Sequence, residues 1–146
     1  MDRLVLLFAL VGWLNGQGWH TNLDEARQLA QQEHRHILLN FSGSDWCGPC
    51  ILLRKDVLDQ PAFVRLADTA LVLVNADFPR NKKNQPAPEQ QRMNDRMADK
   101  YNARGQFPLT LLLTADGKVL KQWEGNPGVS PEVFSAQVRA AIDADK

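Results

Sequence analysis

The sequence is poor in cysteine: its 146 residues include two, Cys47 and Cys50, three positions apart in the stretch DWCGPC. A disulfide between them would close almost no loop. The entropic benefit of a disulfide grows with loop length, so this pair would be a weak structural staple. Two thiols also supply only part of the ligand set that a structural zinc site needs. The scarcity of cysteine therefore favours a reversible redox couple.

The chain also lacks an excess of charge of either sign. It has 17 basic and 17 acidic residues, and the basic ones are scattered along the sequence. Nucleic acids and anionic membranes attract proteins through a one-sided basic field. We therefore expect no nucleic-acid partner. The length and the ordinary globular composition predict a single domain with a core of its own.

Long apolar runs are absent as well. The uncharged run at residues 4–14, LVLLFALVGWL, is shorter than the roughly 20 residues that span a bilayer. It follows Arg3 and suits the apolar core of a secretory signal that is cleaved after Gly18. We predict a signal peptide over 1–18, a domain over 19–146, and a periplasmic or otherwise exported location without stable membrane insertion. A buried first strand and a short membrane anchor are the alternatives.

Short apolar runs and apolar residues at helical spacing predict an α/β protein. Helices are expected at 21–35, 48–60, 61–69, 89–105 and 132–146. Strands are expected at 36–42, 70–78, 109–114 and 119–125. The polar, proline-bearing segment 79–88 is expected to be a surface excursion between a strand and a helix.

Residues at the ends of these elements predict how they connect. Thr21 and Asp24 form a capping-box pattern at the first helix, and Gly105 is the expected stop of the helix at 89–105. Asp116-Gly117 is typical of a hairpin turn. Strands joined through helices should be parallel, and a hairpin must be antiparallel. We expect a mixed central sheet with helices on both faces, completed by a C-terminal β-hairpin plus helix.

The position of the cysteines suits a redox dithiol. Cys47 falls where a buried strand gives way to a helix, and the unpaired amides and dipole of a helix N-terminus favour a thiolate. Cys50 follows one turn deeper on the same side of that helix. It can attack a mixed disulfide formed at Cys47, so Cys47 is the expected nucleophile and Cys50 the expected resolving thiol.

The motif WCGPC at a strand–helix junction, followed by FPLT ahead of a hairpin, resembles the thioredoxin superfamily. The longer stretches ILLNFSGSDWCGPC, VNADFPR and GQFPLTLLLTADGKVL are similar to exported bacterial thioredoxin-like proteins of the thiol–disulfide interchange group. The resemblance runs from about Trp19 to the C-terminus. It implies a thioredoxin-like fold and a protein-disulfide oxidoreductase that uses neither a cofactor nor a metal.

The resemblance also implies a groove for the substrate. Its expected lining is Trp46, Gly48, Pro49, Phe107, Pro108 and Gly125. Pro108 matches a family proline whose peptide bond is cis and faces the dithiol, and the backbone of Phe107 would pair with an extended substrate. The simpler alternatives are that Pro108 begins an edge strand and that Trp46 is a packing residue.

Two positions depart from the family pattern. The family has a buried Asp on the strand before the motif and a Lys partner on the next strand; these positions fall here at Asn40 and Leu73. Losing both charges together avoids leaving one of them buried and unpaired. Asp45, in the loop, is expected to be solvated. The proton of Cys50 would then go to water or to substrate.

Two further polar clusters are the histidines and a basic group: His20, His34 and His36, and Arg80, Lys82 and Lys83. The histidines do not converge with the cysteines in the expected topology, so no metal site is predicted. The basic residues fall in the predicted surface excursion. They are expected to form a solvated loop, and contact with a partner is the alternative.

The sequence thus predicts an exported, monomeric thiol–disulfide oxidoreductase that acts on disulfide-bearing proteins. Gly48-Pro49 between the cysteines resembles the reducing branch of the family, so reduction is expected, with a membrane thiol donor recharging the dithiol. Three alternatives stay open: a disulfide isomerase, a non-enzymatic thioredoxin-like binding module and a metal-binding chaperone.

Overall fold

The computed structural model describes residues 18–146, so the predicted signal peptide, apart from Gly18, lies outside the described residues. The helices are α1 (Leu23–Glu33), α2 (Gly48–Leu53), α3 (Pro61–Ala70), α4 (Pro88–Tyr101) and α5 (Pro131–Ala144). The strands are β1 (His36–Ser42), β2 (Leu71–Asp77), β3 (Leu109–Leu113) and β4 (Val119–Glu124). A π-helical segment η1 (Arg54–Leu58) follows α2, and a 3-10 turn η2 (Lys82–Asn84) precedes α4. No helix in this part of the chain is long and apolar enough to cross a membrane.

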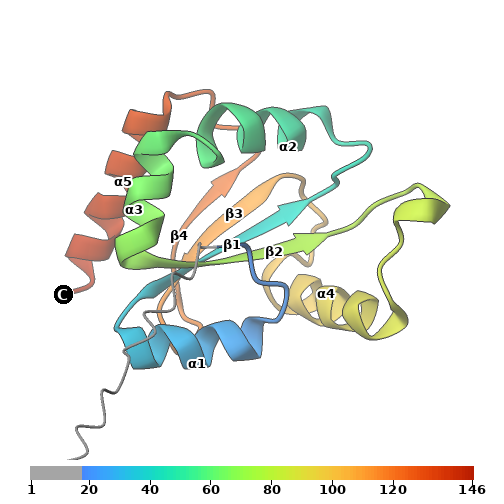
Figure 1. Ribbon diagram of the computed structural model, residues 1–146, viewed down its shortest axis with the longest axis horizontal. Coiled ribbons are helices and arrows are strands. Elements are labelled where there is room, and N and C mark those ends of the chain that lie inside the picture. The colour runs from blue at the N-terminus through green and yellow to red at the C-terminus, as the bar shows by residue number, and fades with distance from the viewer. Residues whose placement is uncertain (1–17) are drawn as a thin grey trace, which may run out of the picture.

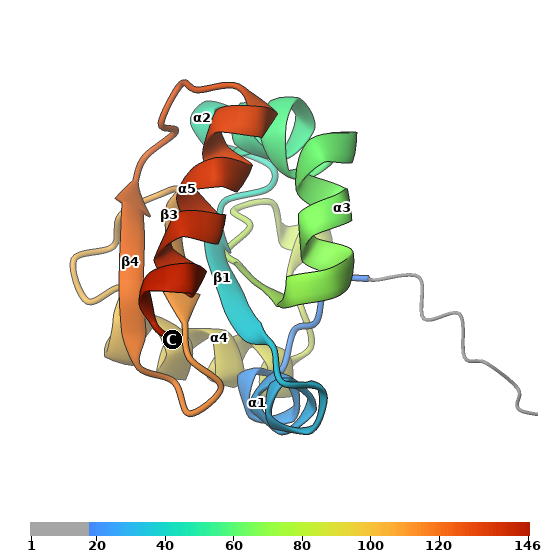
Figure 2. The same ribbon diagram turned by 90° about the vertical axis from the view of Figure 1, so that its left-hand side faces the viewer.

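The strands form one mixed sheet in the order β2-β1-β3-β4. β1 is parallel to β2 and antiparallel to β3, and β3 forms a hairpin with β4. Figure 1 shows α1 and α4 on one side of this sheet and α2, α3 and α5 on the other. α5 packs beside α3, as Figure 2 also shows. The predicted mixed sheet with helices on both faces and a closing hairpin and helix is confirmed.

Strand β1 is buried along nearly its whole length because helices cover both of its faces. Ile37, Leu39 and Phe41 point into the core shared with α1 and α4. Leu38 points the other way, into the core shared with α3 and α5. The alternation of side chains along a strand explains this division. Asn40 lies on the same face as Leu38, toward the side that carries α2.

Helix α1 begins one residue later than its capping pattern predicts. The N-cap is Asn22, whose side-chain oxygen accepts a hydrogen bond from the amide of Glu25 at 3.2 Å. The carbonyl of Asn22 also accepts the first intrahelical bond, from Ala26 at 3.1 Å. The prediction of Thr21 as the cap was therefore wrong, since Asn is at least as good an N-cap and stands next to it.

Helix α4 ends before Gly105, the residue predicted to stop it. Asn102 leaves the helical conformation at φ −139°, and it is buried. Its side chain donates to the carbonyl of Gln106 at 2.8 Å and accepts from the amide of Gln106 at 2.9 Å. A side chain that bonds the backbone in this way competes with the helix. Gly105 instead takes the left-handed conformation, φ 66°, in the turn that follows.

The helix predicted over 48–60 is divided. α2 ends at Leu53 and η1 continues with wider π-helical turns, in which the amide of Asp59 donates to the carbonyl of Arg54 at 2.8 Å. Val57 and Leu58, although adjacent, are both buried in this segment. The helix restarts at Pro61, as predicted.

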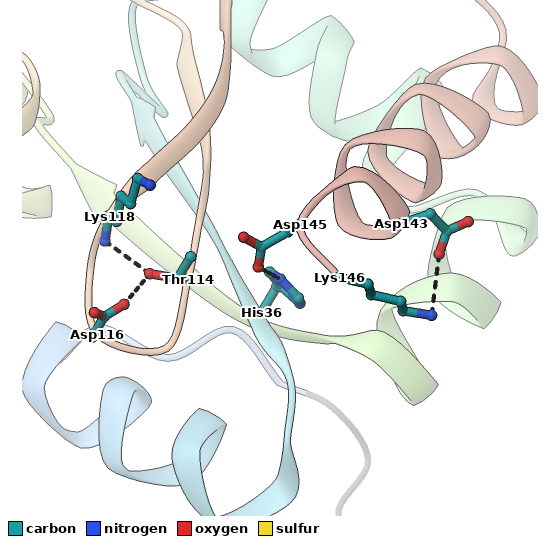
Figure 3. A network of polar contacts seen from close by, with 7 residues as sticks. All are labelled: His36, Thr114, Asp116, Lys118, Asp143, Asp145 and Lys146. Carbon is teal, nitrogen blue, oxygen red and sulfur yellow. Dashed lines mark hydrogen bonds and ion pairs between the residues drawn. The ribbon is translucent and has the colours of Figure 1, made fainter.

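Several polar contacts lie at the end of the sheet opposite the cysteines (Figure 3). In the hairpin turn, the hydroxyl of Thr114 donates to the carboxylate of Asp116 and accepts from the amide of Lys118 at 3.0 Å. The hydrogen bond from Thr114 holds the pKa of Asp116 below its ordinary value. At the start of β1, the ring of His36 lies 2.9 Å from the carboxylate of Asp145, next to the end of α5.

Candidate active site

The two cysteines form a disulfide at the junction of β1 and α2. Their Cα atoms are 5.3 Å apart, and the residues Cys47 and Cys50 are 4% and 3% exposed. Cys47 is the N-cap of α2, and the amide of Cys50 donates to its Sγ at 3.3 Å. In the reduced protein, a donor in this position favours a thiolate at Cys47 over a thiol. The predicted placement of Cys47 at the start of a helix is confirmed.

The loop before Cys47 is held by a close contact between Gly43 and Trp46. A Cβ atom at Gly43 would lie 2.2 Å from a carbon of the indole, so a residue with any side chain would displace the ring. The indole nitrogen donates to the carbonyl of Phe78 at 2.7 Å, and the amide of Cys47 donates to the carbonyl of Gly43 at 2.9 Å. These contacts set the position of the residue that precedes the first cysteine.

Three aromatic rings join this loop to the segment before β3. The rings of Trp46 and Phe107 meet edge to face at 5.4 Å, and those of Phe78 and Phe107 meet at 5.6 Å in the same manner. Edge-to-face pairs of this kind add to the stability that burial provides. Trp46 and Phe107 are therefore brought together, although about sixty positions separate them in the sequence. Phe78 was not among the predicted site residues.

Pro108 and Gly125 are also neighbours. The Phe107–Pro108 peptide bond is cis, and the carbonyl of Pro108 accepts a hydrogen bond from the amide of Gly125 at 2.9 Å. Gly125 has φ 72°, a left-handed conformation that favours glycine. The two hydrogen bonds between the side chain of Asn102 and the backbone of Gln106 hold the segment just before Phe107. Gly48 and Pro49 are exposed in the first turn of α2.

Asp45 is exposed but not merely solvated, in contrast to the prediction. Its carboxylate accepts hydrogen bonds from the backbone amides of Arg80 and Asn81, both at 2.9 Å, and from the side-chain amide of Asn84 at 3.1 Å. The bond from the Arg80 amide, followed by the one from Asn84, holds the pKa of Asp45 below its ordinary value of 3.8. No local sequence pattern could reveal this contact, because its donors lie 35 to 39 positions away.

Arg80 also differs from the prediction of a solvated basic group. The central carbon of its guanidinium lies 3.8 Å from the centre of the Trp46 ring, a cation–π contact beside the active-site loop. Lys82 and Lys83 are exposed, as predicted. Arg80 was expected to be solvated, but it lies beside the active-site loop.

Asn40, a residue of β1 on the side of the sheet that carries α2, has no charge. The side-chain amide of Asn40 is buried and donates to the hydroxyl of Thr110 on β3 at 2.9 Å. Across the parallel pair, Asn75 lies opposite Asn40, and Leu73 lies opposite Leu38 in the apolar core. The buried Oδ1 of Asn75 has no hydrogen-bond partner among the described residues. At the two positions where the family resemblance implies a charged pair, this chain has a neutral amide, Asn40, and an apolar side chain, Leu73.

The histidines are dispersed. His20 bridges to β2 through its backbone, His34 ends α1 in a left-handed conformation, and His36 contacts Asp145. Across residues 18–146, no group of three His, Cys, Asp or Glu side chains could hold a metal ion.

Known proteins with similar sequences show the family to which this chain belongs. The thioredoxin-like family model matches residues 18–115. A disulfide bond reductase, DsbH of Chlamydia pneumoniae, is 33% identical over 118 residues, which cover 81% of this chain and 69% of the relative. The chain belongs to the thioredoxin-like family. Its dithiol motif and its relatives make it a thiol–disulfide oxidoreductase of that family, as predicted.

Solved structures of thioredoxin-like proteins confirm the fold. A structure of a DsbH oxidoreductase superposes with a TM-score of 0.77 at 31% identity, covering 86% of this chain and 84% of the other. The reduced C-terminal domain of DsbD from Neisseria meningitidis superposes with a TM-score of 0.60 at 24% identity, covering 82% and 93%. At that lower identity the likeness concerns the fold alone.

Proposed function

We propose that this thioredoxin-like chain reduces disulfides in exported proteins. The observation that carries the proposal is the Cys47–Cys50 pair at the start of α2, with the amide of Cys50 directed at the Sγ of Cys47. This geometry makes the two sulfurs unequal. Both residues are buried, but Cys47 caps the helix and its sulfur accepts the amide, which favours negative charge there, whereas Cys50 lies within the helix.

The reaction has two exchange steps. The thiolate of Cys47 attacks one sulfur of the substrate disulfide, which forms a mixed disulfide and releases one substrate thiolate. Cys50 then gives its proton to solvent and attacks the Sγ of Cys47. The mixed disulfide breaks, the second substrate thiolate leaves, and the Cys47–Cys50 disulfide forms. Two electrons pass from the dithiol to the substrate, and both substrate thiolates take up protons from water.

The Gly-Pro pair between the cysteines and a relative described as a disulfide bond reductase support the reducing direction. Each turnover leaves the chain oxidised, so a dithiol donor must reduce Cys47–Cys50 again. In an exported protein this donor would be a membrane thiol protein. The export signal over residues 1–18 and a monomeric state are part of the same proposal.

The proposed substrate groove consists of the six residues predicted from the sequence: Trp46, Gly48, Pro49, Phe107, Pro108 and Gly125. The ring contact between Trp46 and Phe107 and the hydrogen bond between Gly125 and Pro108 support a common surface. An extended substrate segment would lie along it, paired with the backbone of Phe107.

Trapping tests the assigned roles. Cys50→Ser should accumulate substrate proteins in mixed disulfides with Cys47, because the second step is blocked; Cys47→Ser should trap none. The reduction potential, measured by equilibration with glutathione, should lie nearer about −270 mV than about −120 mV. A potential above about −180 mV, or reactivation of scrambled ribonuclease that depends on Cys47 more than on Cys50, would refute the reducing direction.

A further inference from the structure

Residues 79–85 form a hydrogen-bonded loop beside the active site. The carboxylate of Asp45 accepts hydrogen bonds from the amides of Arg80 and Asn81. The side chain of Gln85 donates a hydrogen bond to the carbonyl of Pro79 at 2.7 Å. Asn81 caps the short turn η2 by accepting from the amide of Lys83 at 3.3 Å. The side-chain and backbone bonds give the loop a defined shape, although it is almost wholly exposed.

The three cationic side chains of this loop, Arg80, Lys82 and Lys83, lie in no ion pair with a carboxylate of the described residues. The nearby carboxylate of Asp45 accepts hydrogen bonds from two backbone amides of the loop and from the side chain of Asn84, but forms no ion pair with a cationic side chain of residues 18–146. The segment 78–88 contains no acidic residue of its own.

A second stacked arginine shows what is unusual about Arg80. The guanidinium of Arg54 lies 4.3 Å from the ring centre of Trp19, and its Nε also bonds the carboxylate of Asp59 at 2.9 Å. Arg80 is stacked more closely, at 3.8 Å from Trp46, but lacks such an acidic partner among the described residues. Stacking holds a guanidinium in a fixed orientation while its in-plane N–H donors remain available for a carboxylate.

We propose that Arg80, assisted by Lys82 and Lys83, binds an acidic side chain near the disulfide of the protein substrate. Trp46 connects Arg80 to the dithiol, because it stacks on the guanidinium and directly precedes Cys47. A substrate sulfur at Cys47 would place the neighbouring residues of the substrate within reach of the basic loop. The preferred substrates are therefore proteins in which Asp or Glu flanks a cysteine of the disulfide. This inference rests on the proposed reductase function.

The test uses two disulfide-bonded peptides that differ at one position, Glu or Gln next to a cysteine. Rates of reduction are measured with the reduced protein in single turnover. At low ionic strength the native chain should reduce the Glu peptide about threefold to fivefold faster than the Gln peptide, as expected for one exposed, oriented ion pair. Arg80→Gln should remove most of this preference, because Lys82 and Lys83 contribute only the smaller part. Arg139→Gln, which removes an exposed charge from α5, should leave the ratio unchanged.

Two further measurements keep the inference testable if Arg80→Gln fails to fold. The Lys82→Gln/Lys83→Gln variant should lower the ratio in part. For the native chain, the ratio should approach one at about 1 M salt, where the Debye length is about 3 Å. Equal rates for the two peptides at low salt, or a ratio unaffected by Arg80→Gln, would refute the role of the loop. Failure to reduce either peptide would instead refute the proposed function.

Discussion

Trp46 lies directly over Gly43, so that a Cβ atom at Gly43 would fall 2.2 Å from a carbon of the indole. This contact explains why a glycine stands four residues before the first cysteine. It lets the indole reach the carbonyl of Phe78 and the ring of Phe107. The side chain of Trp46 thereby packs the loop that carries Cys47 against the segment that carries Pro108.

Gly43→Ala should displace the Trp46 ring. We expect the free energy of unfolding to fall by about 1–3 kcal/mol, the usual cost of forcing a group into a packed site. Urea unfolding followed by tryptophan fluorescence measures it. Gly48→Ala is the control, because a Cβ atom there meets nothing within 4 Å; its change should stay within about 0.5 kcal/mol. Equal changes in the two variants would contradict the packing argument.

Asp45→Asn should weaken the loop at residues 79–85 in a pH-dependent way. The folded pKa of Asp45 lies below 3.8, chiefly because of the Arg80 amide. A lowered folded pKa contributes stability above the unfolded pKa, and this is lost as the pH falls through the folded value. The urea midpoints of the native chain and the variant should therefore differ at neutral pH and converge in acid.

The control for Asp45→Asn is Asp99→Asn on the exposed face of α4. It should leave the urea midpoint nearly unchanged at neutral pH, as most exposed substitutions do. If the midpoints of Asp45→Asn and the native chain differ equally at neutral and acid pH, the ionised carboxylate is not what holds the loop.

The buried bond between Asn40 and Thr110 should show strong coupling. Thr110→Val leaves the amide of Asn40 without its partner at 2.9 Å, which should cost about 1–3 kcal/mol of unfolding free energy. Asn40→Leu/Thr110→Val removes both polar groups and should cost less than the sum of the single changes. A double-mutant cycle by urea unfolding gives the coupling directly. Simple additivity would show that the pair contributes little.

Gly125→Ala should slow the reduction of protein disulfides. Alanine disfavours φ 72°, and a change of φ would turn the Gly125 amide away from the carbonyl of Pro108. Gly128→Ala is a matched control, because Gly128 has φ 65° but its amide bonds the side chain of Asn126 instead. Both variants should lose about 1 kcal/mol of stability, while insulin reduction should fall in Gly125→Ala alone. Equal rates in the two variants would remove Gly125 from the proposed groove.

Much of the fold could be predicted because its signals are local. The apolar run of β1 and the glycine and proline after Cys47 predict a strand and a helix start at the observed positions. Errors occurred where neighbouring residues compete for one role. Asn22 caps α1 in place of Thr21, and Asn102 ends α4 before Gly105 because its side chain bonds Gln106.

The order of the elements, the mixed sheet and the placement of Cys47 at the start of a helix could be predicted from the amino-acid sequence, because periodicity and turn residues act over a few positions. Three contacts are visible only in the folded chain: Asp45 binds the loop of Arg80, Trp46 packs against Phe107, and Asn75 lies opposite Asn40. These contacts join residues that are distant along the chain. They depend on strand order and register, which bring together side chains that no local pattern connects.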